Sequence, residues 1–131
     1  MNYSEKRRFV RLDMNTKLNF QIKEVSGEQV LAEKNSGIVK NLSVEGICFS
    51  SEKQLKSGSK IELAIALPGS PSPIEIRGEV VWSRPIEEQK GAKVVFDTGV
   101  KLVNIAQGDE NRFLVYMCDK MTEQLNKYLK V

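Results

Sequence analysis

The chain has 131 residues, and its 40% hydrophobic and 28% charged content fits one folded domain better than a disordered chain. It contains no histidine, which excludes a histidine-ligated metal site and every catalytic dyad or triad that uses histidine as the base. The formal net charge is +3, and residues 1–12 carry all of this excess because four basic residues there accompany one acidic residue.

No secretory or membrane segment is expected in this chain. The start, MNYSEKRRF, lacks the apolar core of a signal peptide, and no apolar run approaches the ~18 residues that cross a bilayer. We therefore expect a cytoplasmic protein that does not insert into membranes. In that reducing compartment, Cys48 and Cys118 are expected to be buried and to behave as small apolar residues.

Arginine is concentrated in the basic N-terminal arm, residues 1–12, as Arg7, Arg8 and Arg11. A guanidinium is planar and permanently charged, so it can grip a phosphate with two hydrogen bonds, match the O6 and N7 acceptors of guanine, or stack on a base. In an extended segment Arg7 and Arg11 point to one side and Arg8 points to the other. Taken alone, the run is more typical of a solvated tail.

Short stretches of alternating apolar and polar residues follow the arm, and their period of two predicts β-strands with one buried face. Phe20, Phe49 and Trp82 occupy positions that are expected to point inward. Gly78 lies inside an alternating stretch, which suggests a bulge or a close approach of two backbones. An exposed hairpin loop is expected at residues 83–93. The strands are expected at residues 17–22, 30–33, 37–41, 46–50, 60–67, 74–82, 93–96 and 99–103.

The period changes at Asp109, where apolar residues begin to recur at steps of three and four. This predicts an amphipathic helix over residues 109–129 with Asp109 as its N-cap. The expected fold class is mainly β, a small antiparallel barrel closed or flanked by the helix. The apolar stripe of the helix could pack on its own barrel or on another copy, as a homodimer. The single domain is expected to consist of the arm 1–12, the barrel 13–107 and the C-terminal helix 108–131.

The stretch NLSVEG, residues 41–46, lies between two predicted strands and first suggests a hairpin turn. Asn41 and Ser43 can hydrogen-bond the turn backbone, and Gly46 supplies either a positive φ or a tight approach. The same atoms suit a nucleotide. Asn41 offers an amide to a base edge, Ser43 offers a hydroxyl to a phosphate or base, and Gly46 lets the backbone come close to the ligand.

The two stretches RRFVR, residues 7–11, and NLSVEG together resemble the PilZ domain family of bacterial cyclic di-GMP receptors. The family pattern is an RxxxR arm, commonly RRxxR, followed by [D/N]xSxxG. Each half is a weak signal, but both in this order, ahead of a strand-rich chain, form a strong joint signal. TGVKLVNI, residues 98–105, also resembles a late strand of that family. The resemblance covers residues 5–105 and implies a six-stranded antiparallel β-barrel with a C-terminal α-helix.

The resemblance implies a cyclic di-GMP receptor that is not an enzyme and needs no cofactor or metal. The arm, expected to be mobile without ligand, would become ordered on binding and signal to an unidentified downstream protein that controls motility, biofilm or exopolysaccharide. Asn41 has one acceptor oxygen where family members with aspartate have two, so its contact with guanine is expected to be weaker. The implied ligand-binding residues are Arg7, Arg8, Arg11, Asn41, Ser43 and Gly46.

Binding of the arm to the cytoplasmic leaflet is disfavoured, because lipid-recruiting clusters usually carry more basic residues and a lipid or apolar anchor. Three further alternatives compete with the cyclic di-GMP hypothesis. The first is a PilZ-like protein-interaction module that does not bind nucleotide, although degenerate members usually lose the arginines or the Asn/Ser/Gly pattern that this chain keeps. The second is a nucleic-acid binder of the OB or cold-shock type, which would display several aromatics and a broad basic groove, whereas the body of this chain is neutral. The third, an enzyme, is disfavoured because the sequence has no histidine, phosphate-binding glycine loop or metal-ligand cluster.

Overall fold

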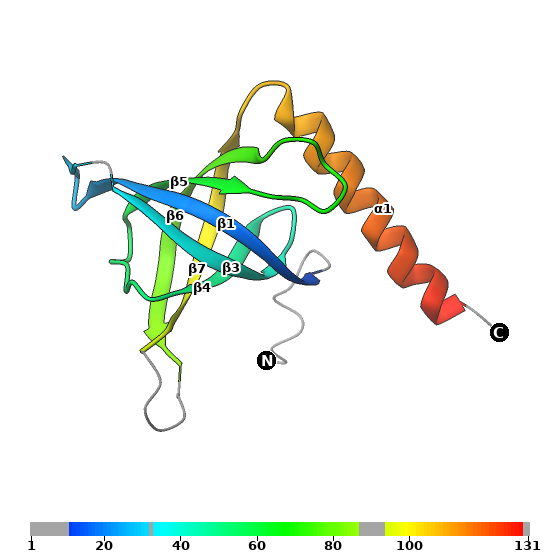
Figure 1. The fold of residues 1–131 in the computed structure, drawn as a ribbon, viewed down its shortest axis with the longest axis horizontal. Helices are drawn as coiled ribbons and strands as arrows, with labels where there is room; N and C mark the ends of the chain where they lie inside the picture. The colour runs from blue at the N-terminus through cyan, green and yellow to red at the C-terminus, as the bar shows by residue number, and fades with distance from the viewer. Residues whose placement is uncertain (1–10, 32, 87–93, 130–131) are drawn as a thin grey trace, which may run out of the picture.

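The computed structural model describes residues 11–31, 33–86 and 94–129, and it shows a β-barrel with one helix attached at its side (Figure 1). All paired strands are antiparallel. The elements are β1 (Leu12–Val25), β2 (Glu28–Gln29), β3 (Lys34–Leu42), β4 (Gly46–Ser51), β5 (Lys60–Ile65), β6 (Ile74–Pro85), β7 (Phe96–Ile105) and α1 (Asp109–Leu129).

Strand β1 closes the barrel. The neighbouring strands follow the order β1-β3-β4-β7-β6-β5, and β5 then pairs with β1. Residues 18–21 of β1 pair with β3 on one side and with β5 on the other. The six long strands therefore form the predicted closed antiparallel barrel, and β2 only adds a short ladder to the end of β1.

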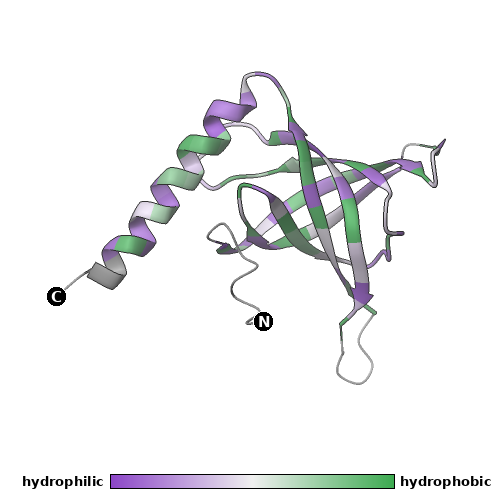
Figure 2. Ribbon diagram, turned by 180° about the vertical axis from the view of Figure 1, so that it is seen from behind, coloured by the Kyte–Doolittle hydropathy of each residue, from purple (hydrophilic) through white to green (hydrophobic). Residues whose placement is uncertain are grey.

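Alternating apolar side chains from the six strands fill the barrel. Phe20 and Phe49 point inward as predicted, and their ring centroids lie 5.0 Å apart. Helix α1 adds Phe113 and Met117, each 1% exposed, to the same core. Hydrophobic and hydrophilic segments alternate along the strands in Figure 2. Because each such side chain contributes roughly 1.5–3 kcal/mol on full burial, this single core is the main source of stability.

The structure corrects several predicted strand boundaries. Residues 30–33 were predicted to form a strand, but none of the described residues there does, and β3 starts at Lys34. The reason is the two-residue reversal at Ser26 and Gly27, which both have positive φ and return the chain at once into β2. Separate strands were also predicted at residues 93–96 and 99–103. The structure has one strand there, β7, which begins at Phe96, and residues 87–93 lie outside the described part.

Two register shifts interrupt the pairing of β6 with β7. One lies between Arg77 and Gly78, where a side-chain Cβ on Gly78 would lie 2.9 Å from the carbonyl oxygen of Lys101, which confirms the prediction for this glycine. The other lies between Val80 and Trp82. There Val81 of β6 has no partner in β7, so it is an extra residue that ends the alternation at Val80. The prediction that Trp82 points inward is therefore wrong, and Trp82 is 36% exposed.

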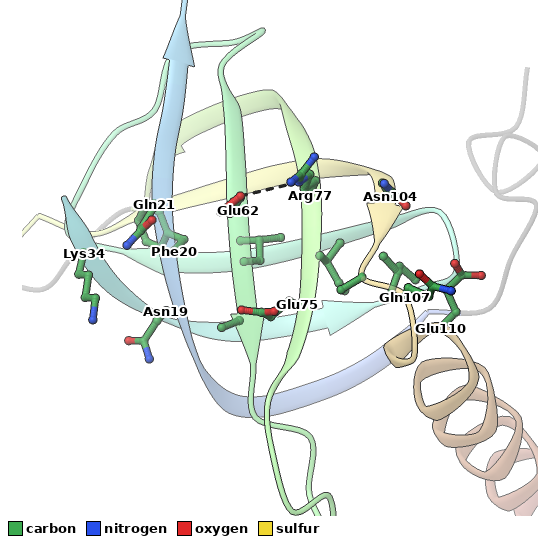
Figure 3. A pocket seen from close by; sticks show the side chains of 15 residues that line it. Asn19, Phe20, Gln21, Lys34, Glu62, Glu75, Arg77, Asn104, Gln107 and Glu110 are labelled. Carbon is green, nitrogen blue, oxygen red and sulfur yellow. Dashed lines mark ion pairs between the residues drawn. The ribbon is translucent and has the colours of Figure 1, made fainter. Parts of the chain in front are cut away.

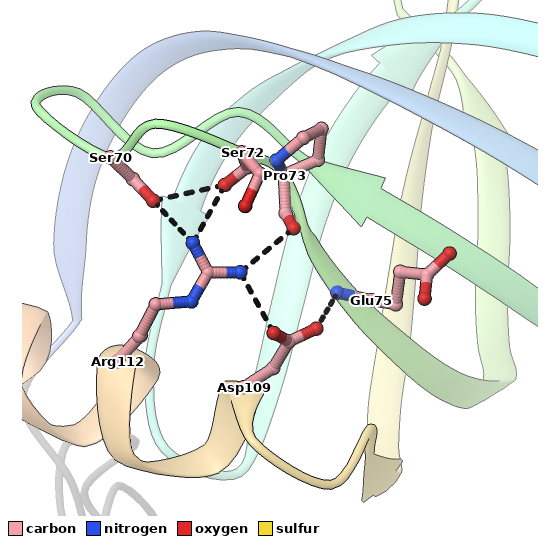
Figure 4. Close-up of polar contacts among 6 residues, drawn as sticks. All are labelled: Ser70, Ser72, Pro73, Glu75, Asp109 and Arg112. Atoms are coloured by element: carbon pink, nitrogen blue, oxygen red, sulfur yellow. Dashed lines mark hydrogen bonds and ion pairs between the residues drawn. The ribbon is translucent and has the colours of Figure 1, made fainter.

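Polar contacts tie the first turn of α1 to the barrel (Figure 4). We call Asp109 and Arg112 the latch. One carboxylate oxygen of Asp109 accepts from the backbone N–H of Glu75 in β6 at 2.9 Å, and the other accepts from Arg112 at 2.7 Å. Arg112 also donates to the Ser70 hydroxyl (2.8 Å) and to the carbonyl oxygens of Ser72 (3.0 Å) and Pro73 (3.1 Å).

The cysteines are more accessible than the sequence predicts. Cys48 is half-buried in β4, and Cys118 is exposed on α1. The expectation that both are buried is therefore wrong for Cys118. Cys118 follows Met117, the last buried side chain of the described part of the helix, and does not reach the core.

The latch makes a testable contribution to stability. The N–H of Glu75, followed by Arg112, lowers the pKa of Asp109 below its ordinary 3.8. Its stabilising effect is therefore present above that value and is lost as the pH falls through the folded-state pKa. We expect Asp109→Asn to reduce the free energy of unfolding by about 1 kcal/mol near neutral pH and much less below pH ~3, in urea titrations. Asp119→Asn, an exposed carboxylate of the same helix, should show no such pH-dependent difference.

Candidate ligand-binding site

The structure describes four of the six residues predicted to bind ligand. Arg11 is exposed and immediately precedes β1. Asn41 is half-buried near the end of β3, Ser43 lies in the turn that joins β3 to β4, and Gly46 is the first residue of β4. Arg7 and Arg8 lie outside the described residues, so their predicted role stays a prediction.

Ser43 builds the turn between β3 and β4. Its backbone N–H donates to the carbonyl oxygen of Gly46 at 2.9 Å, which closes the hairpin. Its hydroxyl oxygen accepts from the N–H groups of Glu45 (3.3 Å) and Gly46 (3.2 Å), and only 5% of the residue is exposed. The hydroxyl is thus already engaged by the backbone, which is the local structural use that the sequence allowed.

Gly46 is required by a close approach of two strands. A Cβ at this position would lie 2.9 Å from the carbonyl oxygen of Val100 in β7, closer than side chains tolerate. The carbonyl oxygen of Glu45 also accepts from the N–H of Leu102 at 3.0 Å, so the turn is fixed to β7 as well as to β3. The second half of the motif therefore holds three strands together beside Asn41.

Asn41 belongs to a line of residues that crosses the outside of five strands. Registered pairs link Asp13 of β1 to Asn41, Asn41 to Cys48 of β4, Cys48 to Gly99 of β7, and Gly99 to Trp82 of β6. Their strand neighbours, such as Leu42 and Phe49, are buried inside the barrel, so this line faces outward. We call these five residues the outward row. At ~4.8 Å between strands it extends over about 19 Å.

Trp82 forms one end of the outward row with an aromatic surface. Its indole ring covers Gly99, where a Cβ would collide with the ring atoms. The guanidinium of Arg84 lies over the same ring, 4.6 Å from its centroid. Because a guanidinium is itself flat, the stacked pair offers a planar, positively charged surface on which a base could lie.

Basic side chains gather around the middle of the row. Three positive charges favour the thiolate of Cys48 and tend to lower its pKa, which indicates that all three lie near this side chain. They belong to Lys40, Arg11 and Arg84. The pKa of Cys48 is nevertheless raised above 9.0, because burial, followed by the charge of Asp97, outweighs them. The thiol of Cys48 therefore stays protonated near neutral pH, with both basic and acidic side chains around it.

Asp97 offsets part of this positive charge. Its Oδ2 accepts from the ammonium of Lys40 at 2.9 Å, and its buried Oδ1 has no hydrogen-bond partner in the described part of the chain. Lys40 projects outward beside Asn41 because a register shift between Val39 and Asn41 places it outside the regular ladder. Arg11 and Arg84 remain as the cations of this surface without an ion pair among the described residues.

A separate groove of the described residues lies elsewhere on the barrel. It has a volume of about 910 Å³ and runs over β1, β5, β6 and the start of α1 (Figure 3). It shares no residue with the outward row. Its charged lining residues are Glu62, Glu75, Glu110, Lys34 and Arg77. Because carboxylates outnumber cations there, and Glu62 already pairs with Arg77, the groove is poorly suited to a phosphate ligand.

Two further findings bear on function. In the described ranges, no cluster of three or more acidic or cysteine side chains is arranged to hold a metal ion. Over the same ranges, no helix is both long enough and apolar enough to cross a membrane.

Sequence comparison places the chain in a family. The model of the PilZ domain matches residues 5–117, so the chain belongs to the PilZ domain family. The comparison with curated proteins finds no match.

Several solved structures share the fold. They include the Bacillus subtilis inhibitor of motility MotI/DgrA (23% identity, TM-score 0.65), the PilZ domain of Escherichia coli YcgR with c-di-GMP (14%, 0.62) and the K. pneumonia MrkH–c-di-GMP complex (13%, 0.59). The match with MotI/DgrA covers 93% of this chain and 53% of that chain. The match with the YcgR domain covers 96% and 99%, and the match with MrkH covers 93% and 55%, in the same order. The chain thus spans about half the length of MotI/DgrA and MrkH. At these identities the likeness shows the fold.

Sequence reasoning missed Lys40, Trp82 and Arg84 as neighbours of the predicted site. Strict alternation assigned Trp82 to the core, and no local pattern relates Arg84 to Asn41. The pairing of β7 with both β4 and β6 brings them to one surface. The signal available in the sequence was the interruption GEVVW, where two consecutive valines precede the only tryptophan.

The structural role of Ser43 can be measured. Ser43→Ala removes the oxygen that accepts from two backbone N–H groups, so we expect the free energy of unfolding to fall by about 1–2 kcal/mol in urea titrations. Ser36→Ala, an exposed serine of β3, should change it by less than about 0.5 kcal/mol. Equal stabilities of Ser43→Ala and the wild type would show that this hydroxyl does not hold the turn.

Proposed function

We propose that this chain is a cyclic di-GMP receptor that binds the dinucleotide over the outward row. The supporting observation is the convergence of Arg11, Asn41 and Trp82, which lie far apart in the sequence, on one outer surface of the barrel. Members of the family bind this ligand, and the YcgR and MrkH structures are complexes with c-di-GMP. The neighbours are too distant in sequence to assign individual contacts, so the residue roles below rest on geometry.

The phosphates are proposed to bind at the arm end of the row. Arg11 is exposed, carries a charge that no described carboxylate neutralises, and lies close enough to influence Cys48. The arm contributes Arg7 and Arg8 from residues outside the described part. A guanidinium fork binds two phosphate oxygens at once, and charge-assisted hydrogen bonds contribute roughly 1.5–3 kcal/mol each.

The guanines are proposed to contact Asn41 and the aromatic end of the row. The Asn41 amide can donate to O6 or N7 and accept from one N–H of a guanine. A base can also stack on the exposed side of the Trp82–Arg84 pair. Ser43 and Gly46 are then proposed to act indirectly, by shaping the turn that holds Asn41 in place. Of the three motif residues 41, 43 and 46, only Asn41 is proposed to contact the ligand directly.

The output of binding is proposed to be a change at the arm that a downstream protein reads. Ordering about eight arm residues costs on the order of 1–2 kcal/mol per residue in backbone entropy, so several arginine contacts must offset it. Motility control is the proposed output by analogy with the motility inhibitor MotI/DgrA. Control of biofilm or exopolysaccharide is proposed only from the family resemblance. The alternative is a PilZ protein-interaction module without a nucleotide ligand.

The single tryptophan gives a direct readout of binding. We expect cyclic di-GMP to change the emission of Trp82 and to bind in the micromolar range or tighter by calorimetry. Arg11→Ala should weaken binding by about ten- to a hundredfold, because it removes charge-assisted hydrogen bonds of roughly 1.5–3 kcal/mol.

Arg77→Ala is the matched control for that substitution. Arg77 is an equally charged, exposed arginine of β6 that faces the acidic groove and not the row, so its loss should leave the affinity unchanged. Absence of both heat and fluorescence change with the wild type would reject the receptor proposal and favour the interaction module. Equal affinities of Arg11→Ala and the wild type would reject the proposed position of the ligand.

The arm is expected to become protected when the ligand binds. Trypsin can cut after Lys6, Arg7, Arg8 and Arg11, so limited proteolysis followed by mass spectrometry reports on this segment alone. We expect cyclic di-GMP to slow these cuts in the wild type and not in Arg11→Ala at the same ligand concentration. Identical cleavage rates with and without ligand, under conditions where calorimetry shows saturation, would contradict the ordering of the arm.

A further inference from the structure

The barrel core reaches along one side of α1 as far as Met121. Phe113 and Met117 are buried, and the latch ties the helix start to the loop after β5. From residue 118 to residue 126 no side chain is buried. Figures 1 and 2 both show the C-terminal half of the helix extending away from the strands. A helix with so little cover has apolar surface left to bury.

The uncovered surface has the spacing of a coiled-coil seam. Leu114, Cys118, Met121 and Leu125 follow one another at steps of four, three and four. Leu114 is 50% exposed and Leu125 is 56% exposed, Cys118 is exposed, and Met121 is half-buried because one side of it packs against the core. We call these four residues the helix seam. Alternating steps of three and four keep a stripe on one side of a helix against a parallel or antiparallel partner helix.

We infer that two copies of this chain pair antiparallel through the helix seam. The seam is the same when it is read in reverse: leucine at both ends, and a small or flexible sulfur-containing residue at both inner positions. A two-fold axis between residues 119 and 120 therefore sets Leu114 opposite Leu125 of the second copy, and Cys118 opposite Met121. Such self-complementarity is what a two-fold symmetric interface requires.

The distribution of charge along the helix favours the same orientation. Residues 109–119 carry three acidic and one basic residue, whereas residues 120–131 carry three basic and one acidic residue. Antiparallel pairing sets the acidic half against the basic half, and parallel pairing would set like charges together. The residues of the seam are uncharged, and so are the positions beside it, Val115, Thr122 and Gln124. The charged side chains of the helix therefore stay in water, where they favour one orientation of the pair without a desolvation cost.

One helix per copy makes a small interface, so the association is expected to be weak, with a micromolar dissociation constant. The pairing does not depend on nucleotide. The helix seam contains no residue of the outward row or of the arm. Failure of cyclic di-GMP binding would therefore leave this inference untouched, and the reverse also holds.

Mass measured against protein concentration tests the pairing. We expect sedimentation equilibrium to show an average mass that rises from 14.8 kDa toward twice that value across the micromolar range. Leu125→Glu should return the protein to a monomer at every concentration, with unchanged far-UV circular dichroism because Leu125 is exposed. Leu31→Glu makes the same change at a 94% exposed leucine outside the helix and should dimerise like the wild type.

A wild type that stays monomeric throughout the range would overturn the inference. Equal loss of dimer in Leu125→Glu and Leu31→Glu would also overturn it, because it would indicate non-specific association. A dimer that Leu125→Glu leaves intact would place the interface elsewhere and likewise reject the seam.

Disulfide mapping tests the orientation. In a Cys48→Ser background, Met121→Cys adds a second thiol beside Cys118, and mild oxidation followed by gel isolation yields the covalent dimer. Trypsin cuts after Lys120, between the two cysteines, so the linked peptides identify the partners. A link between peptide 113–120 and peptide 121–127 is expected for antiparallel helices. Links only between identical peptides would show parallel helices and overturn the antiparallel pairing.

Discussion

Closure of the barrel by β1 is the constraint on which the other features depend. Residues 18–21 of this strand pair with β3 and β5 at the same time, which removes the open edges that a six-stranded sheet would otherwise expose. Closure also decides which side of every strand is inside. Once Leu18 and Phe20 enter the core, the outward positions of β3, β4, β7 and β6 are set by register, and the outward row follows.

The NLSVEG motif serves the fold and the proposed site through different residues. Ser43 and Gly46 hydrogen-bond each other across a tight turn, and Gly46 lets this turn lie against β7. Asn41, two residues before Ser43, is half-buried on the outer side of β3, and its side-chain amide has no hydrogen bond to another described residue. Two residues of the motif thus have a structural role at a junction of three strands, and Asn41 is the one proposed to contact the ligand.

The helix is coupled to the barrel at one end only. Asp109 and Arg112 join its first turn to the backbone around β6, and Phe113 and Met117 complete the core. The remaining turns carry the helix seam beyond the strands. Of the two predicted alternatives for the apolar helix surface, packing on the barrel is observed for Phe113 and Met117, and pairing with another copy is the proposal for the helix seam.

Local patterns in the sequence were sufficient to predict most of the secondary structure and the family of this protein. Period-two alternation determined most strands and the inward Phe20 and Phe49, the three-and-four spacing determined the helix, and the two short motifs determined the family. The tertiary structure alone decided that Trp82 and Arg84 join Asn41, and that Cys118 is exposed. The physical reason is that a single inserted residue, at Lys40 or Val81, reverses which side a strand presents, and only the pairing of strands distant in sequence shows where such an insertion occurs.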